Sequence, residues 1–224
     1  MQRKLRHDTR CKVSASRLVL AALLCPTLLL AAAPRAEWEL GLVLTRTANA
    51  ENGKELYAAC AACHGLKGEG ASDGTVPAIG GQWYTVVAKQ IVDFRAGLRS
   101  DVGMEHFTNR KHLSFSQPVA DVALYIARLP RAPPKPPPKG VNLEQGAAAY
   151  ARNCGRCHGA RGEGKEETLA PRLAGQHYRY ILEQMDAARS GERRTMIPGH
   201  VGLETSLTRG ELENVAAYLT TRGA

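Results

Sequence analysis

A five-residue motif, Cys-x-x-Cys-His, occurs twice in this chain and constrains its fold more than any other feature. Cys60-Ala-Ala-Cys63-His64 recurs 94 residues later as Cys154-Gly-Arg-Cys157-His158. One offset that holds across many residue types indicates a tandem duplication of a unit of about 80 residues. Further pairs at this offset are Gly68/Gly162, Pro77/Pro171, Gln82/Gln176, Tyr84/Tyr178, Gln90/Gln184, Arg95/Arg189 and Arg99/Arg193.

The motif is the attachment signal for c-type haem. Two thiols separated by one helical turn match the spacing of the two vinyl groups at the edge of a porphyrin, and the adjacent histidine then points toward the iron. We therefore predict two covalently bound haem c groups. The predicted attachment residues are Cys60, Cys63, Cys154 and Cys157, and the predicted proximal iron ligands are His64 and His158.

Zinc and disulfide chemistry are the alternatives for paired cysteines. A zinc site of four cysteines would have to join pairs that lie 94 residues apart, whereas zinc ribbons separate their pairs by about 15–20 residues. A thioredoxin-like disulfide needs a βαβ context, which the sequence lacks. The other two of the six cysteines, Cys11 and Cys25, lie near the N-terminus, so haem is the favoured interpretation.

Each iron needs a second axial ligand from elsewhere in its unit. Met104 and Met196 follow the proximal histidines by 40 and 38 residues and fall in equivalent places, in the loop after the second helix. They are the predicted distal ligands, because ligation by His and Met raises the potential of a carrier. His106 and His200 lie close by and would instead give bis-histidine haem. Met185 has no partner in the first repeat and is interpreted as core filler.

Positions relative to the motif also indicate candidate residues around each haem. Pro77 and Pro171 each lie 13 residues after a proximal histidine, and their carbonyl oxygens could accept the imidazole Nδ1–H and fix the ring. Other side chains could line the haem or pair with its propionates, although ordinary helix packing and solvated charge explain them equally well. These are Trp83, Tyr84, Tyr178, Arg95 and Arg189.

The chain divides into four segments. Residues 1–50 are predicted to be a targeting leader, with a basic start and an apolar run from Leu18 to Ala33, cleaved or kept as an anchor. Ala31–Ala33 and Ala48–Ala50 are the candidate cleavage sites. Haem domains are predicted at 51–130 and 141–224. The proline-rich segment 131–140 between them favours polyproline II and a semi-rigid spacer.

Each unit is predicted to be helical, so the fold class is all-α. Helices are expected from about Asn52 and Leu143 into the first cysteine, and over 83–96 and 178–189, with Gly97 and Gly191 as stops. The last helices are expected over 117–128 and 209–221. Thr208 and Glu211 form a capping box before the final one. No convincing alternating strand is present.

The net charge of +9 does not indicate a nucleic-acid partner. Residues 1–50 hold eight Lys/Arg and three Asp/Glu, which leaves +4 for the remainder of the chain. Each haem would add two propionates, so the protein with both haems would be close to neutral. A basic patch for nucleic acid is therefore not expected.

With these residues in place, residues 51–224 outside the linker resemble the cytochrome c4 family. The resemblance rests on both motifs followed by Gly, on Pro171-Arg-Leu-Ala-Gly-Gln176 with Tyr178 and Gln184, and on Phe94-Arg-Ala-Gly-Leu-Arg99 with Leu113-Ser114. It implies two class I cytochrome c domains facing each other, both with His/Met haem. It also implies a periplasmic location. The linker is longer than expected for the family, so the sequence leaves open whether the two domains form a tight interface.

Three functions follow from this interpretation. The first is a soluble or membrane-anchored electron carrier that takes electrons from a cytochrome bc complex or a dehydrogenase and donates them to a terminal oxidase. The second is the cytochrome subunit of a dehydrogenase complex, such as a flavocytochrome that oxidises sulfide. The third, a haem enzyme such as a peroxidase, requires an open sixth position, and two equivalent methionines argue against it. We therefore expect a carrier with no catalytic residues.

Overall fold

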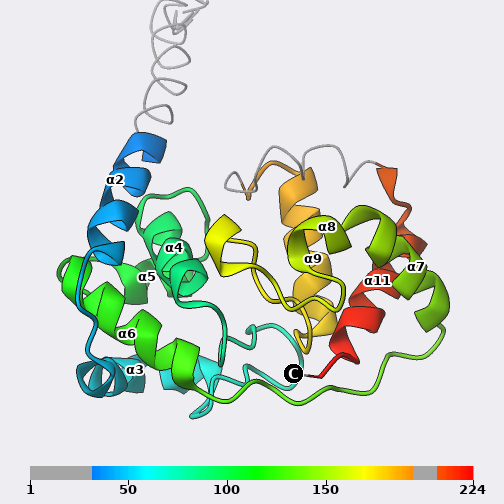
Figure 1. Ribbon diagram of the computed structural model, residues 1–224, viewed down its shortest axis with the longest axis horizontal. Helices are drawn as coiled ribbons and strands as arrows, with labels where there is room; N and C mark the ends of the chain where they lie inside the picture. The colour runs from blue at the N-terminus through cyan, green and yellow to red at the C-terminus, as the bar shows by residue number, and fades with distance from the viewer. Residues whose placement is uncertain (1–31, 194–205, 224) are drawn as a thin grey trace, which may run out of the picture.

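The computed structural model describes residues 32–193 and 206–223, which form two helical units side by side (Figure 1). The first unit contains α2 (Ala32–Leu44), α3 (Ala50–His64), α4 (Tyr84–Arg95), α5 (Val102–Thr108) and α6 (Ser116–Arg128). The second contains α7 (Leu143–Asn153), α8 (Gly155–His158), the 3₁₀ turn η1 (Glu166–Thr168), α9 (Tyr178–Arg189) and α11 (Arg209–Thr220). The prediction of an all-α fold with two tandem domains is confirmed.

Helix boundaries follow local signals in the sequence. Asn49 caps α3 by accepting hydrogen bonds from two backbone N–H groups of the first turn, as an N-cap residue does. The predicted capping box between Thr208 and Glu211 is present at the start of α11. Gly97 and Gly191 follow α4 and α9 with φ of 69° and 77°. Glycine adopts this left-handed conformation at little cost, so both helices end where predicted.

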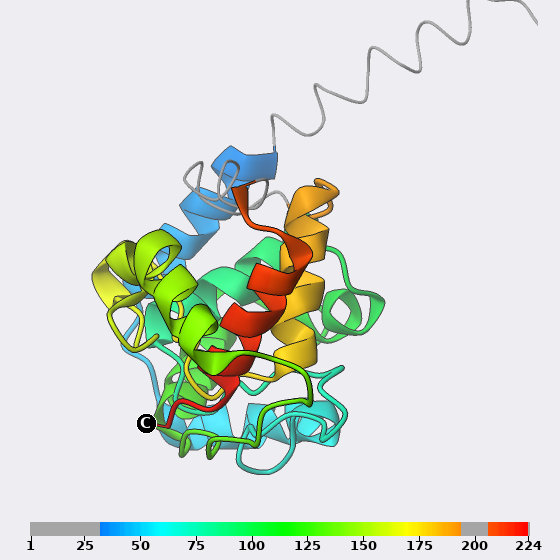
Figure 2. The same cartoon turned by 90° about the vertical axis from the view of Figure 1, so that its right-hand side faces the viewer.

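In each unit the helix that leads to the Cys-x-x-Cys-His motif crosses the last helix at a glycine. A Cβ placed on Gly53 of α3 would lie 2.1 Å from the backbone oxygen of Asp121 in α6. A Cβ on Gly146 of α7 would lie at the same distance from the backbone oxygen of Asn214 in α11. Glycine therefore permits a close crossing, which Figure 2 shows for α7 and α11. Valine, leucine, isoleucine and tyrosine side chains fill a separate core in each unit.

The two units differ at the haem-binding helix. In the first unit α3 runs unbroken to His64, whereas in the second α7 ends at Asn153 and α8 begins at Gly155. Repeat two has one more residue between its tyrosine and its first cysteine, four positions from Tyr150 to Cys154 against three from Tyr57 to Cys60. The break absorbs the additional residue.

Helix α2 lies inside the segment predicted as leader, and it packs on the first haem domain against α4 and α6. Val43 is fully buried there. Most of the predicted apolar run, Leu18 to Ala33, lies outside the described residues. Cleavage at Ala48–Ala50 would remove α2 and also Asn49, whose N–H donates to Asp121 at 2.7 Å. Where the leader is cut stays a prediction.

The two units contact each other extensively, a point that the long linker leaves open in the sequence. The Trp83 indole N–H donates to the backbone oxygen of Glu163 at 3.1 Å, and the Arg172 guanidinium lies 3.5 Å above the Trp83 ring. The linker is also fixed, because the Lys135 N–H donates to the backbone oxygen of Thr220 at 3.1 Å. An extended proline-rich spacer is long enough to bring the units together without strain.

None of the helices within residues 32–193 and 206–223 is both long and apolar enough to cross a membrane.

Candidate haem sites

The predicted attachment cysteines lie on or beside a helix that ends at the predicted proximal histidine. Cys60 and Cys154 are half-buried, whereas Cys63 and Cys157 are exposed. Burial raises the pKa of the Cys60 thiol to about 11 and that of Cys154 to about 11. One thiol of each pair thus faces apolar surroundings and the other lies at the rim, as expected for two bonds to one porphyrin edge.

Both predicted proximal histidines are buried, and each is held by a proline carbonyl. His64 Nδ1 lies 3.0 Å from Pro77 O, and His158 Nδ1 lies 2.9 Å from Pro171 O. Because a carbonyl oxygen can only accept, Nδ1 carries the proton and Nε2 presents the lone pair that a metal needs. Burial also lowers the pKa of His64, which favours the neutral imidazole.

The glycine after each histidine has a structural reason. Gly65 and Gly159 have φ of 79° and 82°, and a Cβ on either would lie within 2.5 Å of a glutamate carboxylate. Buried tyrosines hold the same turns, since Tyr57 Oη donates to Gly65 O and Tyr150 Oη donates to Gly159 O, both at 2.7 Å. The tight turn directs the chain back toward the proline that contacts the histidine.

Met104 lies on the short helix α5, not in a loop as expected. Its N–H donates to Asp101 Oδ1 at 2.8 Å, and its backbone oxygen accepts from Thr108 Oγ1 at 2.7 Å. His106, the alternative ligand, packs against His112 in a tilted arrangement with ring centroids 4.6 Å apart. Met196 and His200 fall outside the described residues. Met185 packs against the second core, in agreement with its interpretation as filler.

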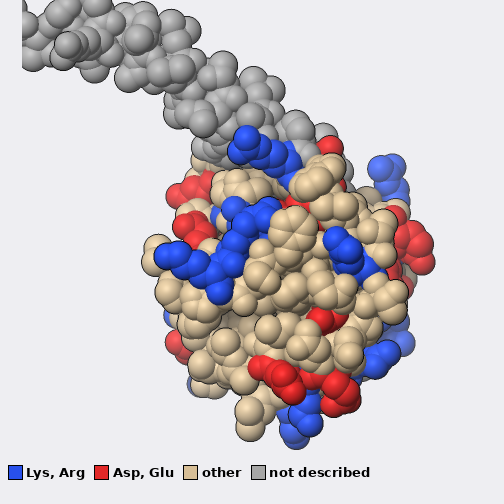
Figure 3. Space-filling model, turned by 90° about the vertical axis from the view of Figure 1, so that its left-hand side faces the viewer, with Lys and Arg blue, Asp and Glu red and all other residues tan. Residues whose placement is uncertain are grey.

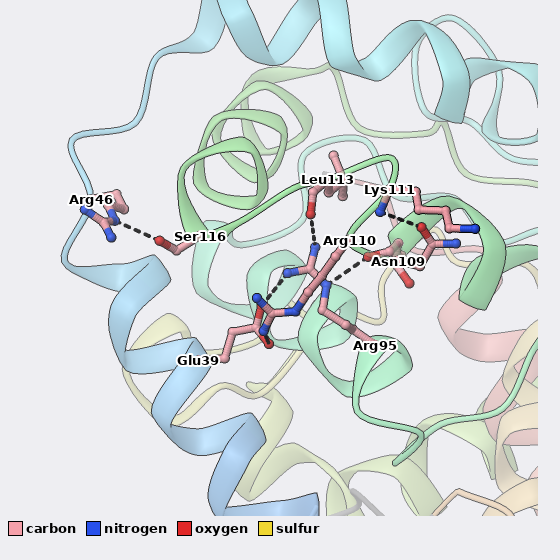
Figure 4. Close-up of polar contacts among 9 residues, drawn as sticks. Glu39, Arg46, Arg95, Asn109, Arg110, Lys111, Leu113 and Ser116 are labelled. Atoms are coloured by element: carbon pink, nitrogen blue, oxygen red, sulfur yellow. Dashed lines mark hydrogen bonds and ion pairs between the residues drawn. The ribbon is translucent and has the colours of Figure 1, made fainter.

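Arg95 fixes the segment that follows Met104 (Figure 4). Its Nε donates to Thr108 O at 2.9 Å and its Nη2 to Leu113 O at 2.7 Å. Its Nη1 pairs with Glu39 of α2, whose other carboxylate oxygen accepts from Arg110 at 3.1 Å. Arg95 is therefore engaged with protein groups at the end of α5 and beyond it. A role toward a propionate, as considered from the sequence, stays a prediction.

The equivalent Arg189 has fewer partners than Arg95 within the part of the chain that the structure describes. Among the described residues its Nη2 makes one long contact, 3.5 Å to Leu207 O. Leu207 corresponds to Leu113 at the 94-residue offset. The second unit therefore repeats the contact between Arg95 Nη2 and Leu113 O. The second unit has no described helix in the place of α2, and the carboxylate that completes the first arrangement comes from α2.

The two predicted tyrosines lie at the starts of α4 and α9. Tyr84 Oη donates to Val43 O at the end of α2, at 3.3 Å, and Tyr178 packs against the second core. Burial raises the pKa of both phenols. Tyr84 thus joins α2 to the first domain, and contact of either ring with haem stays a prediction.

Two arginines and two glutamines from equivalent positions meet between the units. Arg99 donates to Gln90 in its own unit at 2.5 Å and to Gln184 of the other at 2.8 Å. Arg193 donates to Gln184 at 2.9 Å and across to Gln90 at 3.5 Å. Burial and the charge of Arg99 lower the pKa of Arg193 to about 10.

This arrangement is suited to an anionic cofactor. Arg193 Nε is buried without a hydrogen-bond partner among the described residues. The hydrogen bonds from both guanidinium groups go to neutral oxygens of glutamine and, for Arg99, to Tyr180. With the paired thiols and the oriented imidazoles, the chain therefore offers the donor set and the positive charge that a haem with two propionates requires.

Comparison with known proteins agrees with this chemistry. The model of the cytochrome c family matches twice, at residues 50–129 and 143–222. Cytochrome c4 of Azotobacter vinelandii is 31% identical over 159 residues, which are 65% of this chain and 74% of that protein. The chain belongs to the cytochrome c4 family. A crystal structure of reduced cytochrome c4 from Pseudomonas stutzeri shares the fold, with a TM-score of 0.69 and 23% identity over 79% of this chain and all of that one.

Another relative is named for the enzyme from which it accepts electrons. The thiosulfate dehydrogenase electron acceptor of Stutzerimonas stutzeri is 28% identical over 207 residues, covering 81% of this chain and 91% of that protein. The protein is thus a cytochrome c4-like electron carrier with two covalent haem c groups, as the two family matches imply.

Several residues of these sites were not assigned a role from the sequence. Tyr57, Tyr150, Gly53 and Gly146 recur at an offset of 93 rather than 94, so a search at one fixed offset passes over them. A second search at neighbouring offsets would have found them. Glu39 has no counterpart in the second unit, and no repeat signal could have identified it.

Proposed function

We propose that this protein is a periplasmic carrier that accepts electrons from a dehydrogenase and passes them to a terminal oxidase. The observation that carries the proposal is the close pairing of two equivalent haem-binding units across a hydrogen-bonded interface. Two redox sites held at a constant separation suit a carrier, which needs no substrate pocket. Export is supported by the basic and apolar pattern of the leader.

The predicted ligands would divide the binding of each haem iron between two sides. Each haem, when bound, supplies one iron that alternates between two oxidation states. His64 and His158 would bind it on one side, with their rings fixed by the proline carbonyls. Met104 and Met196 would bind it on the other side. Two protein ligands on each iron exclude substrates, so the protein would exchange electrons without bond-making chemistry.

Surface charge supports fast and weak docking. Residues 51–130 hold eight Lys/Arg and eight Asp/Glu, and residues 141–224 hold eleven and ten. On the face of the first unit shown in Figure 3, basic and acidic side chains are interspersed with uncharged surface. Partner steering would therefore come from local patches and not from net charge.

The donor would be a dehydrogenase of reduced sulfur compounds. This proposal is supported by the relative that accepts electrons from thiosulfate dehydrogenase. The alternative, a permanent cytochrome subunit of a dehydrogenase complex, would leave the protein bound to its partner during purification. A carrier would be isolated alone.

The test reconstitutes electron transfer from a donor enzyme to this protein and from this protein to an acceptor. The purified protein with both haems is mixed with a thiosulfate dehydrogenase and, separately, with a haem–copper oxidase. We expect the dehydrogenase with thiosulfate to reduce both haems, and we expect the reduced protein to support oxygen uptake by the oxidase. Turnover of thiosulfate, sulfide or hydrogen peroxide by the protein alone would refute the carrier proposal.

A further inference from the structure

One peptide group links each predicted proximal histidine to the opposite unit. The carbonyl of Pro77 contacts His64 Nδ1 at 3.0 Å. The N–H of the same peptide group, which belongs to Ala78, donates to Gln176 Oε1 of the second unit at 3.0 Å. A side chain of unit two is therefore one peptide group away from the imidazole of unit one.

The same contact is made in the other direction. The carbonyl of Pro171 contacts His158 Nδ1 at 2.9 Å, and the N–H of Arg172 donates to Gln82 Oε1 of the first unit at 3.0 Å. Gln82 and Gln176 are repeat equivalents, 94 residues apart. The two contacts are reciprocal and have the same geometry, and each ends on the peptide that holds a predicted ligand.

Each glutamine is held in one orientation by further bonds. The Gln176 amide donates back to Ala78 O at 2.8 Å, and its Oε1 also accepts from the N–H of His177 at 2.8 Å. The Gln82 amide donates to Arg172 O at 3.1 Å, and its Oε1 accepts from the N–H of Trp83 at 3.0 Å. The side chains therefore cannot rotate away without breaking several bonds.

A hydrogen bond on a peptide N–H polarises the carbonyl of that peptide, since hydrogen bonds in a chain strengthen one another. A more polarised carbonyl accepts more strongly from the imidazole Nδ1–H. That bond in turn raises the basicity of the metal-binding nitrogen. Stronger electron donation stabilises the oxidised iron and lowers its reduction potential.

We propose that Gln176 and Gln82 are positioning residues that tune the proximal histidine of the opposite unit. Gln176 would act on His64 and Gln82 on His158. The inference rests on the proposed function, because it requires these histidines to bind iron. It means that each unit sets part of its partner's reduction potential, and that loosening the interface would raise both potentials.

The test replaces each glutamine with methionine, which has a similar length and no charge. The readout is the NMR resonance of each histidine Nδ1–H in the reduced, diamagnetic protein labelled with ¹⁵N-histidine. In Gln176→Met we expect the His64 resonance to move upfield as its hydrogen bond weakens, while that of His158 stays in place. In Gln82→Met the His158 resonance should move upfield, while that of His64 stays in place. The reduction potential of the affected haem should rise in each case.

Two further variants sharpen the test. Gln145→Met makes the same substitution at an exposed glutamine near the start of α7 and should move neither resonance. Gln176→Glu keeps an oxygen to accept from the Ala78 N–H at 3.0 Å but loses the donor to Ala78 O. It should therefore preserve the His64 hydrogen bond while weakening the interface, which separates loss of the acceptor from loss of packing.

The outcomes separate this inference from the proposed function. If Gln176→Met shifts both histidines equally, or only His158, the glutamines merely hold the interface together and the inference is wrong. If His64 and His158 in the unaltered protein lack the large ring-current shifts of haem ligands, the assignment of the ligands itself fails.

Discussion

Glu39 of α2 forms a buried ion pair with Arg95 of α4, 56 positions later in the chain. The Arg95 side chain is 6% exposed and that of Glu39 is 11% exposed. Glu39 lies in the segment that sequence patterns assign to a leader. A carboxylate from that segment thus neutralises the guanidinium that fixes the residues after Met104.

Removing this carboxylate should destabilise the first unit. We expect Glu39→Gln to lower the free energy of unfolding by about 3 kcal/mol, because it leaves a buried guanidinium without its counter-charge. Glu37→Gln is the matched control, since Glu37 is exposed on the same helix, and it should cost no more than about 0.5 kcal/mol. Guanidinium-induced unfolding of the protein with both haems measures both. Equal effects would show that α2 is not part of the folded domain.

The helix crossings should not tolerate a side chain. We expect Gly53→Ala and Gly146→Ala to destabilise the protein by at least about 2–3 kcal/mol, since the added Cβ would overlap a backbone oxygen that cannot move freely. Gly41→Ala and Gly210→Ala are controls within helices, because nothing lies within 4 Å of a Cβ at those positions. They should be neutral or stabilise by up to about 1 kcal/mol. Thermal unfolding followed by circular dichroism measures all four.

Acid should destabilise the protein through His177. Its Nε2 donates to Glu69 O across the interface at 2.9 Å, and its Nδ1 accepts from Lys135 of the linker at 2.9 Å. Burial, more than the nearby Lys135, lowers the pKa of His177 below its ordinary value, although Glu69 O and Asp73 oppose this. Protonation would remove the acceptor and place two cations together.

Whether stability rises or falls with pH depends on which state, folded or unfolded, binds the proton more tightly. Since the pKa is lower in the folded protein, the unfolded chain takes up a proton first as the pH falls through about 6.5. Stability should therefore decrease from pH 7 toward the folded-state pKa, with a slope of at most about 1.4 kcal/mol per pH unit from this group. In His177→Gln this part of the pH dependence should disappear. An unchanged slope would assign it to another group.

Haem attachment should be independent in the two units. We expect the double variant Cys60→Ser with Cys63→Ser to carry one covalent haem instead of two, and Cys154→Ser with Cys157→Ser to do the same. Intact-mass spectrometry after acid–acetone extraction counts the haems that remain. Loss of both haems in either variant would show that the units mature together.

Distal ligation can be tested by absorption. We expect Met104→Ala and Met196→Ala each to remove about half of the weak near-infrared band that a sulfur–iron bond gives in oxidised c-type haem. Met185→Ala serves as the control, because Met185 packs in the second core, and it should leave the band unchanged. Absence of the band from the unaltered protein would favour His106 and His200 as ligands.

The duplicated motif predicted most of the fold, because helices of a small haem domain are marked by strong local signals. Gly97 and Gly191 each determine a boundary by backbone geometry, and the Thr208–Glu211 box determines one by hydrogen bonds between side chain and backbone. The sequence predicts a loop at Met104, because a helix of seven residues has too few positions to show a periodic pattern. The break after Asn153 was hidden, since one additional residue does not change composition.

Long-range contacts were harder to predict. Gln82 and Gln176 were visible as a repeated pair, but repetition does not say whether a side chain packs in its own unit or against the other one. Glu39 follows directly on an apolar run with a basic start, so local pattern favours a leader. Its partner Arg95 is identified only in three dimensions, where burial requires a counter-charge.

The reciprocal glutamine contacts have the form of a two-fold homodimer interface, in which residue i of one copy meets residue j of the other and the converse also holds. A single unit with this surface would make the same contacts with a second copy of itself. In a chain that contains both units, the two surfaces no longer have to be identical. His177 already stands where the first unit has Trp83, and both donate across the interface to a backbone oxygen, of Glu69 and Glu163 respectively. Only the histidine can respond to acid, so duplication has allowed one half of a symmetric contact to acquire a property that a true homodimer would carry twice.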